Sequence, residues 1–129
     1  MQRLFSHPTF VLFAITLASV ALAHYLALQF FLYWRYVWFD VPMHFFGGAM
    51  LALMLHSAPV FRDSFPKGFL TRGATLVFVL FVGLSWEVFE LLAGVPVEDN
   101  FVFDTSLDLT MDLIGGYVGY FLARRFATV

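Results

Sequence analysis

The stretch DTSLDLTMDLIGGYVGYFLARRF, residues 104–126, places three aspartates directly before an apolar run. Asp104, Asp108 and Asp112 are spaced four residues apart, so on a helix they lie along one side. The residues that follow Asp112 are apolar or small as far as Arg124, which is typical of a helix inside a membrane. An ionised side chain facing lipid costs about 2.5–3.5 kcal/mol or more. The aspartate stripe must therefore face protein, water or a cation.

The composition of the whole chain also predicts a membrane protein. Of its 129 residues, 61% are hydrophobic and only 12% are charged. A soluble domain of this size could not hide so much apolar surface. The chain has no cysteine, which excludes disulfides, iron–sulfur clusters and thiolate catalysis. It also contains no Walker loop and no dinucleotide-binding fingerprint.

Four apolar runs are long enough to cross a hydrocarbon core, which takes about 20 helical residues. Backbone exposed to lipid must satisfy its own hydrogen bonds, so we expect these runs to be helices. The sequence thus predicts one domain, residues 1–129, that is an all-α integral membrane four-helix bundle with antiparallel neighbours. The expected spans are about 8–33, 41–61, 69–94 and 106–126.

The basic residues predict the orientation of this bundle. In a four-span arrangement six of the seven Lys and Arg residues share one side, and only Arg35 lies opposite. By the positive-inside rule both termini are expected in the cytoplasm. The six residues are Arg3, Arg62, Lys67, Arg72, Arg124 and Arg125.

The first run also has features of a cleaved signal peptide. Arg3 precedes an apolar stretch that contains Ala21-x-Ala23, the small-residue pattern of a cleavage site. The apolar run continues beyond that pattern to Trp34, so we expect an uncleaved span.

The acidic residues gather at the opposite, outer side. Eight of the nine lie in the outer half of the predicted bundle, and only Asp63 lies on the cytoplasmic side. Asp40 and His44 are four residues apart, and Glu87 and Glu90 three apart, so each pair shares a helix face. At ~1.5 Å per residue Asp112 lies ~12 Å deeper than Asp104.

We therefore expect His44, Glu87 and Asp112 at one level inside the bundle, with His24 of the first run as a further candidate. Small residues, among them the Gly115-x-x-x-Gly119 pair, continue these polar faces and favour close helix packing.

A dry cluster of ionised carboxylates repels itself, so several must be protonated or a divalent cation must hold them. Carboxylates with histidine match Mg²⁺, Mn²⁺, Fe²⁺ or Zn²⁺. Asp40 or Asp104 is the expected general base. The alternatives are that Asp104 caps its helix and that the outer aspartates are solvated. The predicted metal ligands are His44, Glu87, Glu90, Asp108 and Asp112.

Three segments together resemble the VanZ-like superfamily of small bacterial membrane proteins, most closely its YjdF-type branch. They are DVPMHFFGGAMLALML, WEVFELLAG and DTSLDLTMDLIGGYVGYFLAR, and the resemblance extends from Asp40 to Arg125. The resemblance implies a multi-pass protein of the bacterial plasma (inner) membrane with a role in the cell envelope. The VanZ name implies glycopeptide resistance. This chain departs from the resistance proteins, which tend towards Glu-x-x-Gln with a nearby arginine where it has Trp-Glu-x-x-Glu.

These observations favour a metal-dependent hydrolase or transferase that acts on a lipid-linked or envelope substrate at the outer leaflet. One alternative is a proton- or cation-coupled transporter, although the inner halves of the spans carry no matching polar ladder. Another is a non-catalytic binding or resistance protein, or a subunit of a larger assembly. The expected partners are membrane lipid, the substrate and a second copy of the chain, and no nucleic acid.

Overall fold

The computed structural model describes residues 7–57, 66–93 and 100–126, and the regular elements in these ranges are all helical. The long helices are α2 (Pro8–Gln29), α4 (Asp40–His56), α6 (Arg72–Ala93) and α7 (Phe101–Phe126). Three short elements accompany them: α3 (Leu32–Arg35), η1 (Val37–Phe39) and η2 (Lys67–Leu70).

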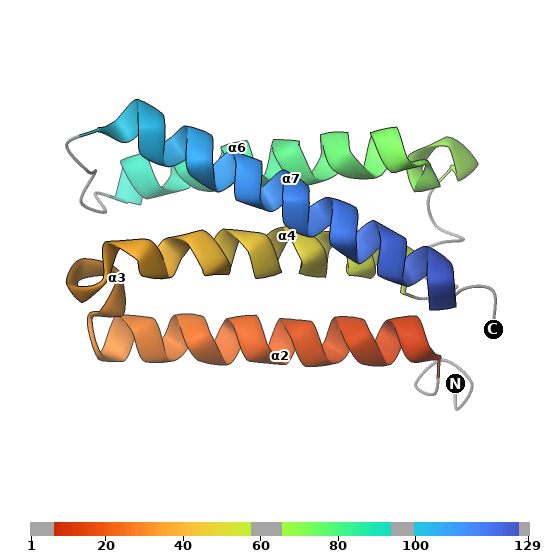
Figure 1. Cartoon of the computed structure of the whole chain (residues 1–129), viewed down its shortest axis with the longest axis horizontal. Coiled ribbons are helices and arrows are strands. Elements are labelled where there is room, and N and C mark those ends of the chain that lie inside the picture. Colours follow the sequence, from red (N-terminus) through yellow and green to blue (C-terminus); the bar gives the residue numbers. More distant parts are fainter. Residues whose placement is uncertain (1–6, 58–65, 94–99, 127–129) are drawn as a thin grey trace.

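The long helices form one bundle with α4 at its centre (Figure 1). α4 packs against α2, α6 and α7, and its contact with α7 is the most extensive in the bundle. The beginning of α2 and the end of α7 lie at the same end of the molecule (Figure 1). We call this end the basic end and the opposite end the acidic end, after the charged side chains that lie there.

Three of these helices are long and apolar enough to cross a membrane. They are Pro8–Gln29, Val37–His56, in which η1 continues into α4, and Arg72–Ala93. The predicted all-α membrane bundle is therefore confirmed. α7 has 26 residues, enough to cross a membrane, but it is not one of the three and carries five charged residues. Two of these, Asp108 and Asp112, are buried in the protein.

The predicted boundaries differ from the observed ones at several places, the first of which lies between the first two spans. Pro8 starts α2, as suits a residue without a backbone N–H. The helix ends at Gln29 rather than at Tyr33, because Phe31 adopts a left-handed conformation with φ of 56° and redirects the chain into α3. The predicted ends at Phe61 and Gly94 lie outside the described residues.

α6 and α7 also begin at identifiable places. Thr71, just before α6, accepts a hydrogen bond from the N–H of Ala74 through its hydroxyl (3.3 Å), so it caps the helix. α7 begins at Phe101, five residues before the predicted Ser106, and this brings Asp104 inside the helix.

Glycines allow α4 and α7 to approach backbone to backbone. A Cβ at Gly48 would overlap the backbone of Asp112, and one at Gly115 would overlap the carbonyl of Phe45. Close approach through small residues is the usual way in which membrane helices pack. The two helices that carry Asp40, His44, Asp108 and Asp112 thus make the most extensive contact in the bundle.

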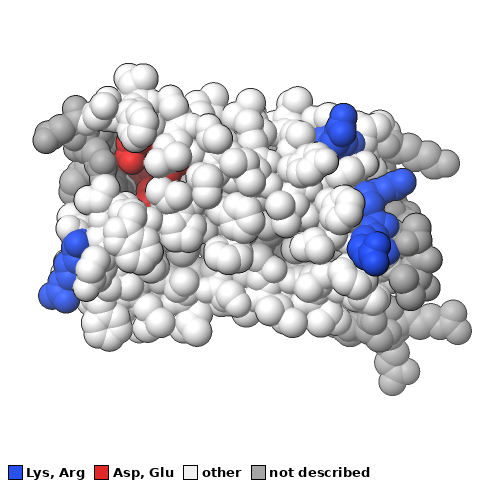
Figure 2. Space-filling view, in the orientation of Figure 1, with Lys and Arg blue, Asp and Glu red and all other residues white. Residues whose placement is uncertain are grey.

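Most of the basic side chains drawn in Figure 2 lie at one end of the molecule, and the acidic ones lie near the other end, which also carries one basic side chain. Arg72 begins α6 and Arg124 and Arg125 lie in the last turn of α7, all at the basic end. Figure 2 shows acidic side chains in a hollow of the surface near the other end. Arg3 and Arg62, which also supported the orientation, lie outside the described residues. The cytoplasmic location of the basic end stays a prediction.

Candidate functional site

The acidic end contains a cluster in which carboxylates from three helices surround His44. α4 contributes Asp40 and His44 one turn apart, α6 contributes Glu87, and α7 contributes Asp108 and Asp112. His44 and Glu87 are each 6% exposed, Asp112 is 4% and Asp108 is 2%. We call these five residues the His44 cluster.

The two ring nitrogens of His44 have different partners. Nδ1 lies 3.2 Å from Oδ2 of Asp112, within hydrogen-bonding distance. An ionised carboxylate only accepts hydrogen bonds, so Nδ1 carries the proton of this contact when Asp112 is ionised. Asp112 reaches this position because Gly83 of α6 has no side chain: a Cβ there would overlap Oδ2 of Asp112.

The second nitrogen, Nε2, faces two more carboxylates. It lies 3.7 Å from Oδ2 of Asp40 and 3.7 Å from Oε1 of Glu87. Both separations are longer than a hydrogen bond. They match donor atoms that share one ion, because ligands bound at about 2.0–2.2 Å lie about 3–4 Å from one another.

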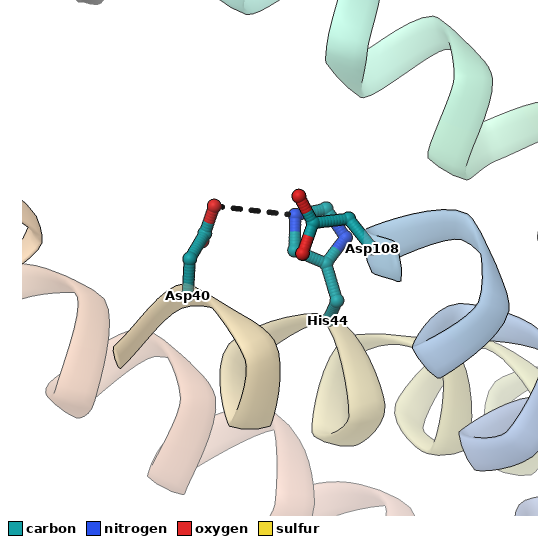
Figure 3. Close-up of side chains that lie close together, drawn as sticks. All are labelled: Asp40, His44 and Asp108. Carbon is teal, nitrogen blue, oxygen red and sulfur yellow. Dashed lines mark ion pairs between the residues drawn. The ribbon is translucent and has the colours of Figure 1, made fainter. Parts of the chain in front are cut away.

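Asp108 completes the group from the α7 side (Figure 3). One ligand atom from each of Asp40, His44 and Asp108 lies within 4.8 Å of the other two. The side chain of Asp40 is 28% exposed, whereas that of His44 is 6% exposed, so the group is reached past Asp40. A site with one open side suits a ligand that exchanges with the outside.

Two buried oxygen atoms of the cluster have no hydrogen-bond partner: Oε1 of Glu87 and Oδ1 of Asp108. The other oxygen of Glu87 accepts a hydrogen bond of 2.9 Å from the hydroxyl of Thr105. Buried polar atoms are nearly always paired, because leaving one unpaired costs free energy. An unpaired oxygen facing Nε2 of His44 therefore calls for a partner, which can be a proton, a water molecule or a cation.

The charge of the cluster also requires such a partner. It contains four carboxylates and a single imidazole, and among the described residues only Arg35 brings a positive charge to this end. Arg35 is exposed on the short helix α3. Protons or a cation must therefore balance most of the negative charge.

The other predicted site residues lie around this cluster. Glu90 lines a cavity beside it. Asp104 is partly buried in the first turn of α7, where its backbone N–H donates to the carbonyl of Asn100 (3.1 Å), so the alternative that it caps the helix is wrong. His24 of α2 is hydrogen-bonded through Nδ1 to the hydroxyl of Tyr33 (2.8 Å). The acids of the outer loop, Glu98 and Asp99, lie outside the described residues.

Sequence reasoning missed two polar groups at this site. Thr105 precedes Asp108 by three residues and Asp112 by seven, so the same helical spacing that linked the aspartates could have revealed it. Tyr33 was placed inside the first span, whereas it lies in α3 beside His24. Burial, with smaller contributions from the charges of Asp40 and Glu90, raises the pKa of the Tyr33 hydroxyl, which keeps it protonated.

The fold and the site together define an integral membrane protein of packed helices with a buried carboxylate and histidine cluster near one membrane face. Comparison of the sequence with known protein families agrees with this class. The chain belongs to the family described as "Predicted membrane protein (DUF2238)", which matches residues 2–128. Neither the curated proteins nor the solved structures searched contain a match.

Proposed function

We propose that the protein is a metal-dependent enzyme of the bacterial plasma membrane that hydrolyses or transfers a group of a lipid-linked or envelope substrate. The observation that carries the proposal is the pair of unpartnered, buried oxygens in the His44 cluster: Oε1 of Glu87, which lies 3.7 Å from Nε2 of His44, and Oδ1 of Asp108. In this proposal a divalent cation, Mg²⁺, Mn²⁺, Fe²⁺ or Zn²⁺, is bound by Asp40, His44 and Asp108.

This ligand set revises the expected roles of four residues. Glu87 and Glu90 were expected to be ligands and are not part of the three-residue group. Asp40 was expected to be a general base, but its position in the three-residue group supports the role of a ligand in this proposal. Asp112 was expected to be a ligand, but its bond to Nδ1 of His44 suits a residue that orients the imidazole. Histidines that bind metals commonly donate their other N–H to a carboxylate in this way.

Glu87 is then the candidate proton acceptor. One of its oxygens is held by Thr105 and the other points to the cluster without a partner. Asp104, on the α7 turn before Asp108, is the alternative base. A bound divalent ion would supply an electrophile for a phosphoryl or carbonyl oxygen and would acidify a bound water. Glu87 would accept the proton of that water or of an attacking lipid hydroxyl.

We further propose that the chain is VanZ-like and closest to the YjdF-type branch. The three motifs behind this resemblance cover most of α4, the end of α6 and most of α7, and they supply the whole His44 cluster. Glycopeptide resistance, or binding of a drug or lipid head group without catalysis, remains an alternative function. Under that alternative the acids need protons but no metal.

Proton or cation transport is supported by one further observation. At the inner side of the bundle, Nε2 of His56 is hydrogen-bonded to the hydroxyl of the fully buried Thr75 (3.0 Å). Between this pair and His44, however, α4 buries only Gly48, Ala49 and the apolar residues that follow. The polar groups are therefore interrupted, and this favours the enzyme over a conduit.

The test is the metal content of the purified protein, measured by elemental analysis after equilibration with each of the four ions. We expect about one bound ion per chain, and we expect His44→Gln and Asp108→Asn to lose it. His56→Gln is the matched control, because it removes a half-buried imidazole at the other end of the same helix. Wild-type protein that stays free of metal at every ion tested contradicts the proposal.

A further inference from the structure

A cavity of about 330 Å³ adjoins the His44 cluster. Along α4 its lining runs from Asp40 to Leu51, which corresponds to ~16 Å of helix axis at ~1.5 Å per residue. On its two sides it is bounded by Leu17–His24 of α2 and by Val82–Glu90 of α6. Cavities of about 300 Å³ and more are large enough for small organic ligands.

The two ends of this cavity differ in polarity. The end near the acidic surface is lined by Asp40, His44, Glu90 and the hydrogen-bonded pair His24 and Tyr33. Towards the middle of the bundle the lining residues are apolar: Leu17, Val20, Met50, Leu51 and Val82. A pocket that is polar at one end and apolar over the rest of its length fits an amphiphile.

The surroundings of the cavity favour a lipid over a soluble amphiphile. α4 forms its floor, while α2 and α6 lie on either side of α4 and make little contact with each other (Figure 1). α2, α4 and α6 are the three helices with the length and composition of membrane spans. A space between such helices at this depth is reached from the hydrocarbon, so a lipid chain can enter it sideways.

The charge of the polar end decides which head group fits the proposed enzyme. The described residues that line the cavity include three acids, Asp40, Glu90 and Asp112, and no lysine or arginine. These acids would repel a phosphate unless a cation lies between them. A phosphate should therefore bind only together with the ion assigned to Asp40, His44 and Asp108.

From this arrangement we infer that the cavity holds the hydrocarbon chain of the substrate, and that the substrate is a lipid phosphate. The chain lies along α4 towards Leu51, and the phosphate lies at the Asp40–His44–Asp108 group. The inference rests on the proposed function for its phosphate end, whereas its chain end rests on the cavity alone.

Gly47 offers a way to fill the cavity without disturbing the cluster. It lines the cavity, and a Cβ built on it would meet no atom within 4 Å. Gly47→Leu thus projects a side chain into the space proposed for the lipid. Gly73→Leu is the matched control, because Gly73 also has no atom within 4 Å of its Cβ but is exposed at the start of α6, at the basic end.

The experiment measures binding of dodecyl phosphate and of butyl phosphate by calorimetry, with the protein in nanodiscs and with the preferred ion present or removed. For the wild type we expect dodecyl phosphate to bind more tightly than butyl phosphate, and only with the ion. Gly47→Leu should weaken the binding of dodecyl phosphate about tenfold or more, because the leucine side chain fills the space in which the apolar chain is buried. Its metal content should not change, and Gly73→Leu should behave as wild type.

The outcomes separate the two proposals. Normal metal content with equal dodecyl phosphate affinity in wild type and Gly47→Leu overturns the inference and leaves the proposed function standing. A second outcome is that the wild type contains no metal but binds dodecyl phosphate, and that Gly47→Leu does not bind it. This outcome contradicts the proposed function and supports the site for the hydrocarbon chain. Binding of dodecylammonium in place of dodecyl phosphate overturns the assignment of a phosphate head group.

Discussion

The imidazole of His44 and the carboxylate of Asp112 are hydrogen-bonded at 3.2 Å across the interface between α4 and α7, although 68 residues separate them in the chain. This contact fixes which nitrogen of His44 is free. With Nδ1 directed to Asp112, Nε2 faces Asp40 and Glu87. A bond between two helices thus determines the chemistry available at the site.

The first prediction concerns Asp112→Asn. The amide has nearly the same shape and can still accept a hydrogen bond from His44, but it has lost the negative charge that makes the imidazole a better ligand. We expect metal affinity to fall about 10–100-fold, the usual effect of losing such a partner, while the helical content stays unchanged. Titration with the preferred ion, in parallel with Asp108→Asn, measures the effect. Equal and complete loss in both variants would make Asp112 a ligand, contrary to the role assigned here.

A second prediction compares two adjacent glycines of α4. A Cβ at Gly48 would overlap the backbone of Asp112, whereas a Cβ at Gly47 would meet nothing within 4 Å. Gly48→Ala should therefore destabilise the protein by about 1–3 kcal/mol through overpacking. Gly47→Ala should be neutral or stabilising, because alanine is favoured over glycine in a helix by about 1 kcal/mol. Thermal unfolding in detergent measures both, and equal melting temperatures would show that the α4–α7 interface can relax.

Much of this architecture could be predicted from sequence because the bilayer leaves few choices. Apolar runs of about 20 residues must be helices in lipid, and the spacing of Asp108 and Asp112 placed both on one face. That face is buried in the structure, as the cost of exposing carboxylates to lipid requires.

The assignment of individual roles could not be predicted in the same way. Helical spacing indicates that Asp40 and His44 share a face, but not which ring nitrogen faces which carboxylate. That choice depends on the rotation of α7 against α4, which the contact of Gly48 with Asp112 sets. The left-handed Phe31, which shortens α2 and places Tyr33 beside His24, also has no local signal such as glycine or proline.

The third prediction tests the hydrogen bond that Thr105 donates to Glu87. Thr105→Val keeps the shape of the side chain but removes the hydroxyl that donates to Oε2 of Glu87. Hydrogen bonds to charged groups contribute about 1.5–3 kcal/mol, so we expect a loss of stability of that order together with reduced turnover once a substrate is known. Thr110→Val is the control, because the hydroxyl of Thr110 is exposed and bonds only to the carbonyl of Ser106 in its own helix. Equal behaviour of the two variants would remove Thr105 from the site.

The fourth prediction tests the orientation of the bundle in the membrane, on which access to the site depends. Because the natural chain contains no cysteine, single cysteines report their own positions without background. Arg35 lies at the acidic end, on the exposed short helix α3, and Arg124 lies in the last turn of α7 at the basic end. If the positive-inside rule holds, a membrane-impermeant maleimide should label Arg35→Cys in intact cells and Arg124→Cys only after permeabilisation. The reverse pattern would place the His44 cluster on the cytoplasmic side. The substrate would then be a lipid of the inner leaflet, because the acidic side chains open to that end of the molecule.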